Sequence, residues 1–273
     1  PITSHSVSIS GGNKDVKYYI SGGYDRQTGV VKVNPDVFQK YNLRSKIDFK
    51  INKHARLSNN TSFYASSYDW IGAGDVEDSF AYASRHALAS FPLKNPDGTW
   101  TYGTPMIAGG YNIANGRHII FGDGIDKNTK VRTDFSNTTQ LTIKPVEQLS
   151  IVGNYTYRLY QNRDTGRLYP LTYRRYPDSA LESYSSGAGL NELTETVATY
   201  VRQSANVFAT YEDTFADAHH FTLTAGMNAE TYHRKSISAS GQNISTPYLN
   251  DLNLIGTDAN GEVVSSVAGG ATS

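Results

Sequence analysis

Apolar and polar residues alternate with a period of two over unusually long stretches of this 273-residue chain. Between Val131 and Ile143, the odd positions include Phe135 and Leu141, whereas every even position is polar or charged. Successive side chains of a strand point to opposite faces, so this segment is predicted to be a strand with one apolar and one polar side. The same template predicts further strands over residues 5–10, 16–24, 41–51, 55–68, 149–159, 197–212 and 221–231. An all-β fold of about eight strands is therefore expected.

Short and long connections alternate strictly between these segments. The short ones are residues 11–15, 52–54, 144–148 and 213–218; the long ones are 25–37, 69–130, 161–195 and everything after Arg234. In an antiparallel meander this places all short turns at one end of the sheet, as in outer-membrane barrels. Strands of soluble sandwiches run ~5–6 residues, whereas about ten to fifteen suit tilted strands that cross hydrocarbon. The pattern predicts a segment of an antiparallel up-and-down transmembrane β-barrel.

Composition removes several classes of function. The 25 Lys and Arg residues balance the 25 Asp and Glu residues, and a nucleic-acid partner would need a cationic surplus. The absence of Cys excludes a disulfide framework, a thiolate nucleophile and a Cys-based zinc site. The sequence contains no Gly-x-Ser-x-Gly, His-Glu-x-x-His or phosphate-loop motif. We therefore expect no enzyme, no cofactor and no nucleic-acid partner.

Charged residues interrupt the polar side of the predicted strands. Within a barrel such side chains face a water-filled lumen, where they either line a substrate path or neutralise one another. The candidate lumen-lining residues are Arg44, Asp48, Arg132, Asp134, Arg158, Arg202 and Glu230.

The longest connection carries the candidates for contact with a ligand or a partner, namely Trp70, Trp100, Tyr102 and Tyr111. Aromatic faces stack on sugar rings and fit extended peptides; the alternative is that these rings pack a compact loop against itself or a lid protein. Within the same connection, Val76–Ser90 is predicted to form a short helix.

Asp123 and Asp126 are weak candidates for a metal site. Their segment, Asp123-Gly124-Ile125-Asp126-Lys127-Asn128, resembles a calcium loop. Lys127 interrupts the alternating ligand positions that such a loop requires, and the late bidentate Glu is missing. A structural loop is therefore favoured, and no metal is expected.

An ordered set of short motifs resembles the SusC/RagA family of TonB-dependent outer-membrane transporters. The first barrel strands of that family are similar to Ser4-His5-Ser6-Val7-Ser8-Ile9-Ser10-Gly11-Gly12-Asn13, Lys17-Tyr18-Tyr19, Gly22-Gly23-Tyr24 and Gln27-Thr28-Gly29. Further matches are Tyr41-Asn42-Leu43-Arg44, Asn95-Pro96-Asp97-Gly98-Thr99-Trp100, Ile143-Lys144-Pro145 and Ala209-Thr210-Tyr211-Glu212-Asp213. The likeness runs in order from about Ser4 to about Leu254.

This resemblance implies a location, a cargo and partners. Residues 1–273 correspond to the first part of a barrel of about twenty-two strands, and no plug domain or N-terminal extension is recognised in them. A Gram-negative outer membrane, contact with the lipid bilayer, and TonB-driven import of an oligosaccharide or peptide are implied. A SusD-like surface lipoprotein would meet the long loops, and TonB would act through regions outside this chain. The alternatives are a soluble glycan-binding β-sandwich or hydrolase, and a small structural barrel closed by eight strands.

Overall fold

The structure is a computed structural model of the chain. It describes residues 1–32, 34–71, 81, 84–85, 91–105, 112–113, 116, 118–119, 127–184, 191–216, 218–246 and 248–272. The strands are β1 (Ile2–Gly12), β2 (Val16–Thr28), β3 (Val37–Lys50), β4 (Ala55–Ile71), β5 (Thr104–Pro105), β6 (Asn112–Ile113), β7 (Lys127–Val146), β8 (Leu149–Leu168), β9 (Leu171–Tyr173), β10 (Glu182–Tyr184), β11 (Glu192–Phe215), β12 (His219–Gln242) and β13 (Ser265–Thr272). A 3-10 turn, η1 (Leu252–Leu254), precedes β13. Within the described ranges, no helix is long and apolar enough to cross a membrane.

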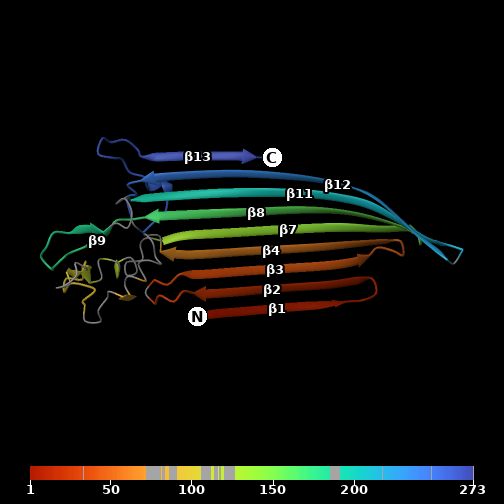
Figure 1. The fold of residues 1–273 in the computed structure, drawn as a ribbon, viewed down its shortest axis with the longest axis horizontal. Coiled ribbons are helices and arrows are strands. Elements are labelled where there is room, and N and C mark those ends of the chain that lie inside the picture. Colours follow the sequence, from red (N-terminus) through yellow and green to blue (C-terminus); the bar gives the residue numbers. More distant parts are fainter. Residues whose placement is uncertain are drawn as a thin grey trace.

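The long strands form one antiparallel meander in the order β1-β2-β3-β4-β7-β8-β11-β12-β13. Every pairing along this order is antiparallel. Figure 1 shows the tight connections at the right-hand end of the sheet and the long connections, one of which carries β9, at the left-hand end. The predicted segregation of short and long connections is confirmed.

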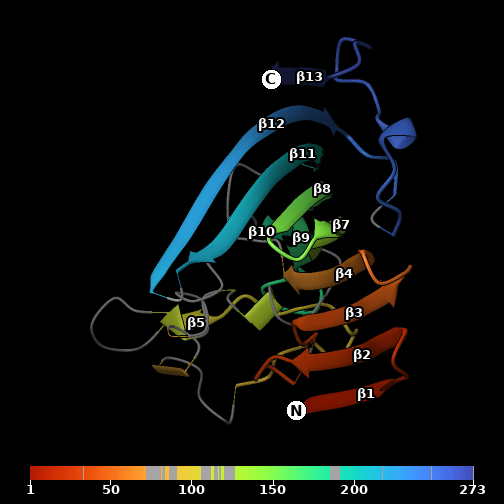
Figure 2. The same cartoon turned by 90° about the vertical axis from the view of Figure 1, so that its right-hand side faces the viewer.

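The main sheet is curved and open, with β1 and β13 as its two edges (Figure 2). A globular monomer of 30.0 kDa is expected to expose about 11,700 Å², whereas this chain exposes 17106 Å². The excess follows from a single-layer architecture, since neither face of the long strands is covered by a second sheet in the described part of the chain.

One face of the sheet, here called the apolar face, carries the apolar set of the sequence pattern. Strand register aligns Leu57 with Leu141, Gly153, Val207 and Met227 in one row across five strands. These side chains are exposed, by 37% at Leu141, 50% at Val207 and 71% at Met227. An exposed apolar surface that spans neighbouring strands is typical of a membrane or protein contact.

The tight turns are stabilised by local side-chain hydrogen bonds. In the β1–β2 turn, Asn13 Oδ1 accepts hydrogen bonds from the backbone N–H groups of Asp15 and Val16, at 2.8 and 2.9 Å. This Asx arrangement replaces part of the strand ladder where the chain reverses. Gly12 precedes the turn with φ +153°, and a Cβ there would lie 2.3 Å from the Val16 carbonyl oxygen. Glycine is therefore required by the close backbone approach.

Among the described residues, few apolar side chains are buried, and they lie toward the long-connection end of the main sheet. Ile71, Ile119, Leu171 and Tyr173 form a small cluster at the end of β4, with Trp100 and Tyr102 packed against it. This cluster, together with the connecting residues 91–105 and 169–184, is here called the loop cluster. A second buried pair, Leu193 and Ile244, lies near the loop ends of β11 and β12.

Two sequence-based expectations need adjustment. The region after Arg234 was expected to be a long connection, yet β12 continues to Gln242, and β13 adds a ninth strand to the sheet by pairing with it. The connection expected over residues 161–195 is shorter in the structure, because β8 continues to Leu168 and β11 begins at Glu192. The predicted helix over Val76–Ser90 lies almost entirely outside the described residues.

Candidate functional site

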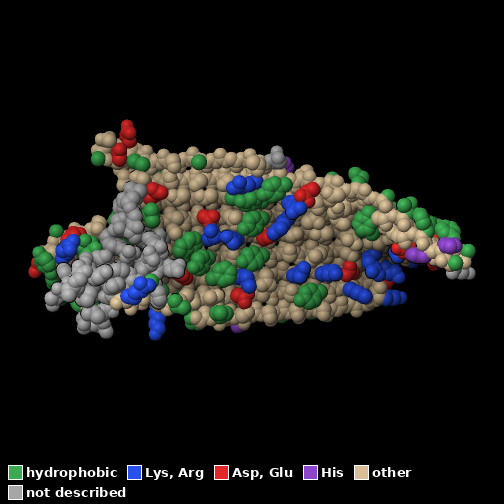
Figure 3. Space-filling model, in the orientation of Figure 1, with side chains coloured by type: hydrophobic (Ala, Val, Ile, Leu, Met, Phe, Trp, Pro, Cys, Tyr) green, Lys and Arg blue, Asp and Glu red, His purple; other side chains and the backbone are tan. Residues whose placement is uncertain are grey.

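The polar face of the sheet, opposite the apolar face, carries the candidate lumen-lining residues. Arg44, Arg158 and Arg202 lie in one row across the sheet, and Ser62 and Ser136 fill the two positions between Arg44 and Arg158. The other candidates, Asp48, Arg132, Asp134 and Glu230, lie on the same face. Figure 3 shows Lys, Arg, Asp and Glu side chains spread over the face turned toward the viewer. Whether this face lines a lumen stays a prediction.

Ion pairs connect neighbouring strands across this face. The Arg158 guanidinium donates to both carboxylate oxygens of Asp134, from Nε at 2.9 Å and from Nη2 at 2.5 Å. Arg202 Nη2 donates to Glu230 Oε2 at 2.8 Å. Further toward the long loops, Lys40 pairs with Asp25 at 3.0 Å and Lys130 with Asp164 at 3.4 Å. Two of the four candidate arginines thus neutralise acids of the same face.

Aromatic residues gather at the long-loop end of the polar face. Trp70 stacks on Tyr68 with ring centroids 5.0 Å apart and 15° between the planes, and Phe38 meets Tyr68 edge-on at 6.5 Å. The Tyr68 hydroxyl donates to Asp36 Oδ2 at 3.1 Å. A cavity of about 620 Å³ opens beside these rings; it is lined by Gln27, Gly29, Asp36, Phe38, Tyr64, Ser66, Tyr68, Lys130 and Arg132. Rings with nearby charged groups suit an oligomeric ligand that has apolar and polar parts.

Trp100 and Tyr102 are engaged in packing of the loop cluster. Lys94 Nζ lies 4.3 Å from the centre of the Trp100 ring. Tyr102 contacts Tyr173 with ring centroids 4.8 Å apart, and the Arg175 guanidinium lies 5.3 Å from the Tyr102 ring. These contacts favour a structural role for both rings, whereas Trp70 lies beside the cavity of the polar face. Tyr111 lies outside the described residues.

Carboxylates stabilise the loop cluster through local hydrogen bonds. Asp97 accepts hydrogen bonds from the Thr99 hydroxyl at 2.6 Å and from the Thr99 backbone N–H at 3.0 Å, and these bonds lower the pKa of Asp97. Glu182 accepts from Arg175 at 2.8 and 3.0 Å and from the Tyr173 hydroxyl at 2.8 Å. The bond from Arg175 is the main cause of the lowered pKa of Glu182. Both groups therefore help to order the long connections that carry them.

The weak metal candidates Asp123 and Asp126 lie outside the described residues. In the part of the chain that is described, no group of three or more His, Asp or Glu side chains is placed to hold a metal ion.

Sequence reasoning missed the cavity and its central ring, Tyr68. Tyr68 and Trp70 are two positions apart, so they point to the same face of β4, and this spacing was the available signal. The contributions of Phe38 from β3 and of Lys130 and Arg132 from β7 depend on strand register, which the sequence pattern did not supply.

The antiparallel meander with one apolar and one polar face is the fold of a segment of a β-barrel wall. No protein-family model matches the chain. The TonB-dependent receptor P3 of Formosa agariphila is 33% identical over 109 residues, which is 37% of this chain and 10% of that protein. A solved structure of the RagAB peptide transporter superposes with a TM-score of 0.69 and 16% identity, covering 99% of this chain and 28% of that chain.

A second solved structure, the RagAB peptide importer in its open-open state, gives a TM-score of 0.69 and 17% identity over 98% of this chain and 28% of that chain. At such identities the solved structures show the fold alone. The chain spans about a tenth of the length of the curated relative and 28% of each RagAB chain. Together these comparisons confirm the resemblance to TonB-dependent, RagA-type transporters and the all-β barrel fold class.

Proposed function

We propose that residues 1–273 form part of the barrel wall of an outer-membrane, TonB-dependent importer of a bulky nutrient. The observation that carries this proposal is the two-sided single-layer sheet. Its apolar face is exposed across five strands around Leu141 and Val207, as expected of contact with acyl chains. Its polar face carries the ion pairs Arg158–Asp134 and Arg202–Glu230, as expected of a water-filled interior.

The rest of the transporter would complete the barrel. The edge strands β1 and β13 are not paired with each other, and free strand edges require further strands or cover. By family resemblance, the closed barrel has about twenty-two strands, and the plug and the TonB-contacting segment lie outside this chain. The short turns would then face the periplasm and the long loops the cell exterior. The protein would reside in the outer membrane of a Gram-negative bacterium.

The cargo is proposed to be an oligosaccharide or a peptide, delivered by a SusD-like lipoprotein at the long-loop end. The solved relatives are described as peptide transporters or importers, which supports a peptide, while stacked rings also suit sugars. Tyr68 and Trp70 beside the cavity are the proposed ligand contacts. Trp100 and Tyr102 are proposed to shape the loop cluster that a lipoprotein would meet.

The two alternatives fit the structure less well. A soluble glycan-binding sandwich or hydrolase would bury its apolar residues between two layers, yet Leu57, Leu141 and Val207 are exposed. A small structural barrel would join its first and last strands, yet β1 and β13 form separate edges in the described part of the chain.

A growth assay tests the import function. A strain lacking the gene is expected to lose growth on one class of polymer, either defined peptides or purified polysaccharides, and to grow normally on glucose and free amino acids. Uptake of the active class by the complemented strain is expected to stop on treatment with a protonophore, because TonB coupling uses the proton gradient. Unchanged growth on every polymer, or uptake that survives the protonophore, contradicts the proposal.

A further inference from the structure

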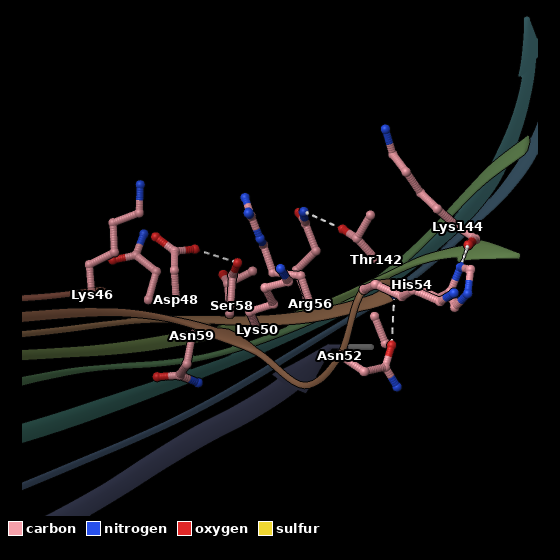
Figure 4. A pocket seen from close by; sticks show the side chains of 15 residues that line it. Lys46, Asp48, Lys50, Asn52, His54, Arg56, Ser58, Asn59, Thr142 and Lys144 are labelled. Carbon is pink, nitrogen blue, oxygen red and sulfur yellow. Dashed lines mark hydrogen bonds between the residues drawn. The ribbon is translucent and has the colours of Figure 1, made fainter. Parts of the chain in front are cut away.

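Basic side chains surround a cavity at the short-turn end of the polar face. This cavity of about 650 Å³ is lined by Lys46 and Lys50 of β3, Lys53 of the β3–β4 turn, Arg56 of β4 and Lys144 of β7. Figure 4 shows Lys46, Arg56 and Lys144 projecting to the same side of the sheet. Asp48 is the one acidic residue among the described side chains that line it. The site therefore carries a local surplus of four positive charges in a chain whose formal net charge is +0.

In the part of the chain that the structure describes, these five cations lack the carboxylate partners that several other cations of the polar face have. Within the described residues, none of the five forms an ion pair within 4.0 Å, whereas Arg158, Arg202, Lys40 and Lys130 each have a carboxylate partner. Asp48 accepts a hydrogen bond from Ser58 at 2.5 Å, and its direct register partner on β2 is another cation, Lys17. A single carboxylate therefore lies among the five cationic side chains of the cavity and Lys17.

The remaining lining residues favour a hydrated, charged ligand over an apolar one. They are amides and hydroxyls, together with His54 and one apolar residue, Ala55. The ring of His54 is held by the backbone, with its Nδ1 2.8 Å from the Lys144 carbonyl oxygen, and Figure 4 shows it pointing away from the lysines. The cavity thus offers neither a stacking platform nor an apolar anchor. Flexible ammonium groups surrounded by amide and hydroxyl groups suit anionic oxygens.

We propose that this cavity, formed around Lys46, Lys50, Lys53, Arg56 and Lys144, binds the carboxylate or sulfate groups of an anionic oligomer. Several cations spread over three strands and a turn match repeated charges on an extended ligand better than a single small ion. Binding at this cavity does not depend on transport, since it requires neither energy coupling nor the aromatic cavity at the other end. It is therefore separable from the proposed import function.

Calorimetric titration of the full-length detergent-purified protein tests the site. The probes are oligogalacturonate, which carries carboxylates, a sulfated dextran oligosaccharide, and neutral dextran of equal length. Binding of at least one anionic probe is expected at 50 mM NaCl, with strong weakening at 300 mM, since exposed charges are screened. The variant Lys46→Gln/Lys50→Gln/Lys144→Gln is expected to bind roughly tenfold more weakly, because each exposed charge pair contributes up to about fivefold.

The matched control is Lys32→Gln/Lys127→Gln/Lys235→Gln, which removes the same charge at positions that do not line the cavity. It is expected to bind as the native protein does. Equal weakening by both triple variants, or equal binding of neutral dextran, overturns the proposal. The proposal is also overturned if the native protein binds no probe and the cavity variant has a lowered melting temperature. That result would show that an acidic segment of the protein itself fills the cavity.

Discussion

Arg158 and Asp134 face each other across β8 and β7 through two parallel hydrogen bonds, Nε to Oδ1 at 2.9 Å and Nη2 to Oδ2 at 2.5 Å. Fork-like pairing fixes both the distance and the plane of the two groups, which a single contact does not. It joins neighbouring strands at the centre of the polar face. The Arg158 side chain is 50% exposed and that of Asp134 21%, so solvent screens the attraction, and its contribution to stability is small.

A double-mutant cycle measures this pair. Asp134→Asn, Arg158→Gln and the double variant are expected to give a coupling energy near the upper end of the ~0.2–1 kcal/mol range of exposed pairs. The measurement is urea unfolding of the full-length protein in lipid vesicles. The Lys130–Asp164 pair, with a single contact at 3.4 Å, is the control and is expected to couple more weakly. Equal coupling in the two pairs would show that the bidentate geometry adds nothing.

The apolar face is tested by two neighbouring residues of β11. Val207 lies on the apolar face and Asn206 on the polar face, where it donates to Asn154 at 2.9 Å. Val207→Arg is expected to cost ~2–4 kcal/mol of membrane folding free energy if the position lies near the bilayer midplane. Asn206→Arg is expected to cost less than 1 kcal/mol, since the side chain stays in water. Folding titrations into lipid vesicles, with heat-modifiable gel mobility as the readout, compare the two.

Leu141→Arg and Gln140→Arg on β7 repeat this comparison at an independent site. The register places Leu141 in the same row as Val207, so similar costs are expected. If arginine were tolerated equally at all four positions, lipid contact of the apolar face would be ruled out.

The sequence predicted the two faces of the sheet because they depend on a local property. The alternation in Val131–Ile143 indicates which side chains share a face. The register of β7 with β4 and β8 keeps these side chains on the same face as their apolar or polar neighbours. The ends of the strands were harder to predict from the sequence. Beyond Gln161, β8 is polar on both faces, so strand and loop carry the same pattern. β13, with the sequence SSVAGGAT, has too few apolar residues to show a period.

The candidate site was only partly predictable, because it depends on which ring is covered by which neighbour. Trp70 and Trp100 carry the same side chain in the same connection, and the sequence gives no reason to separate them. The structure separates them, since Trp100 lies against the Ile71–Leu171 cluster and under Lys94, while Trp70 stacks on Tyr68. Such contacts join segments far apart in the sequence, and no local pattern encodes them.

This difference between the two tryptophans gives a paired prediction. Trp70→Ala is expected to weaken ligand uptake by ~5–30-fold, equivalent to about 1–2 kcal/mol for the loss of a stacked ring, without changing the protease resistance of the loops. Trp100→Ala is expected to destabilise the loop cluster by ~1–3 kcal/mol, below the range for a fully buried tryptophan, since its ring is only partly buried. Concentration-dependent uptake and limited proteolysis of whole cells measure the two effects.

The reverse result would reassign the residues. Uptake lost in Trp100→Ala with intact loops, and retained in Trp70→Ala, would place the ligand at the loop cluster. Tyr176→Ala serves as a control, because this ring is 63% exposed and neither effect is expected from it.

The loop cluster is expected to loosen in mildly acidic solution because of His118. Burial lowers the pKa of His118 from its ordinary value of 6.5, and the ring is packed edge-on against Phe91 and Trp100. A histidine with a lowered pKa in the folded state binds its proton more weakly there than in the unfolded chain. Its contribution to stability is therefore complete above about pH 7 and is lost progressively as the pH falls below 6.5.

Amide hydrogen exchange over residues 91–105 and 169–184, corrected for intrinsic rates, should show faster opening at pH 5.5 than at pH 7.5. His118→Asn, which has no proton to gain, should remove this difference. The lowered pKa values of Asp97 and Glu182 act in a separate window, below about pH 4.5, so opening that begins only there would exclude His118 as the cause.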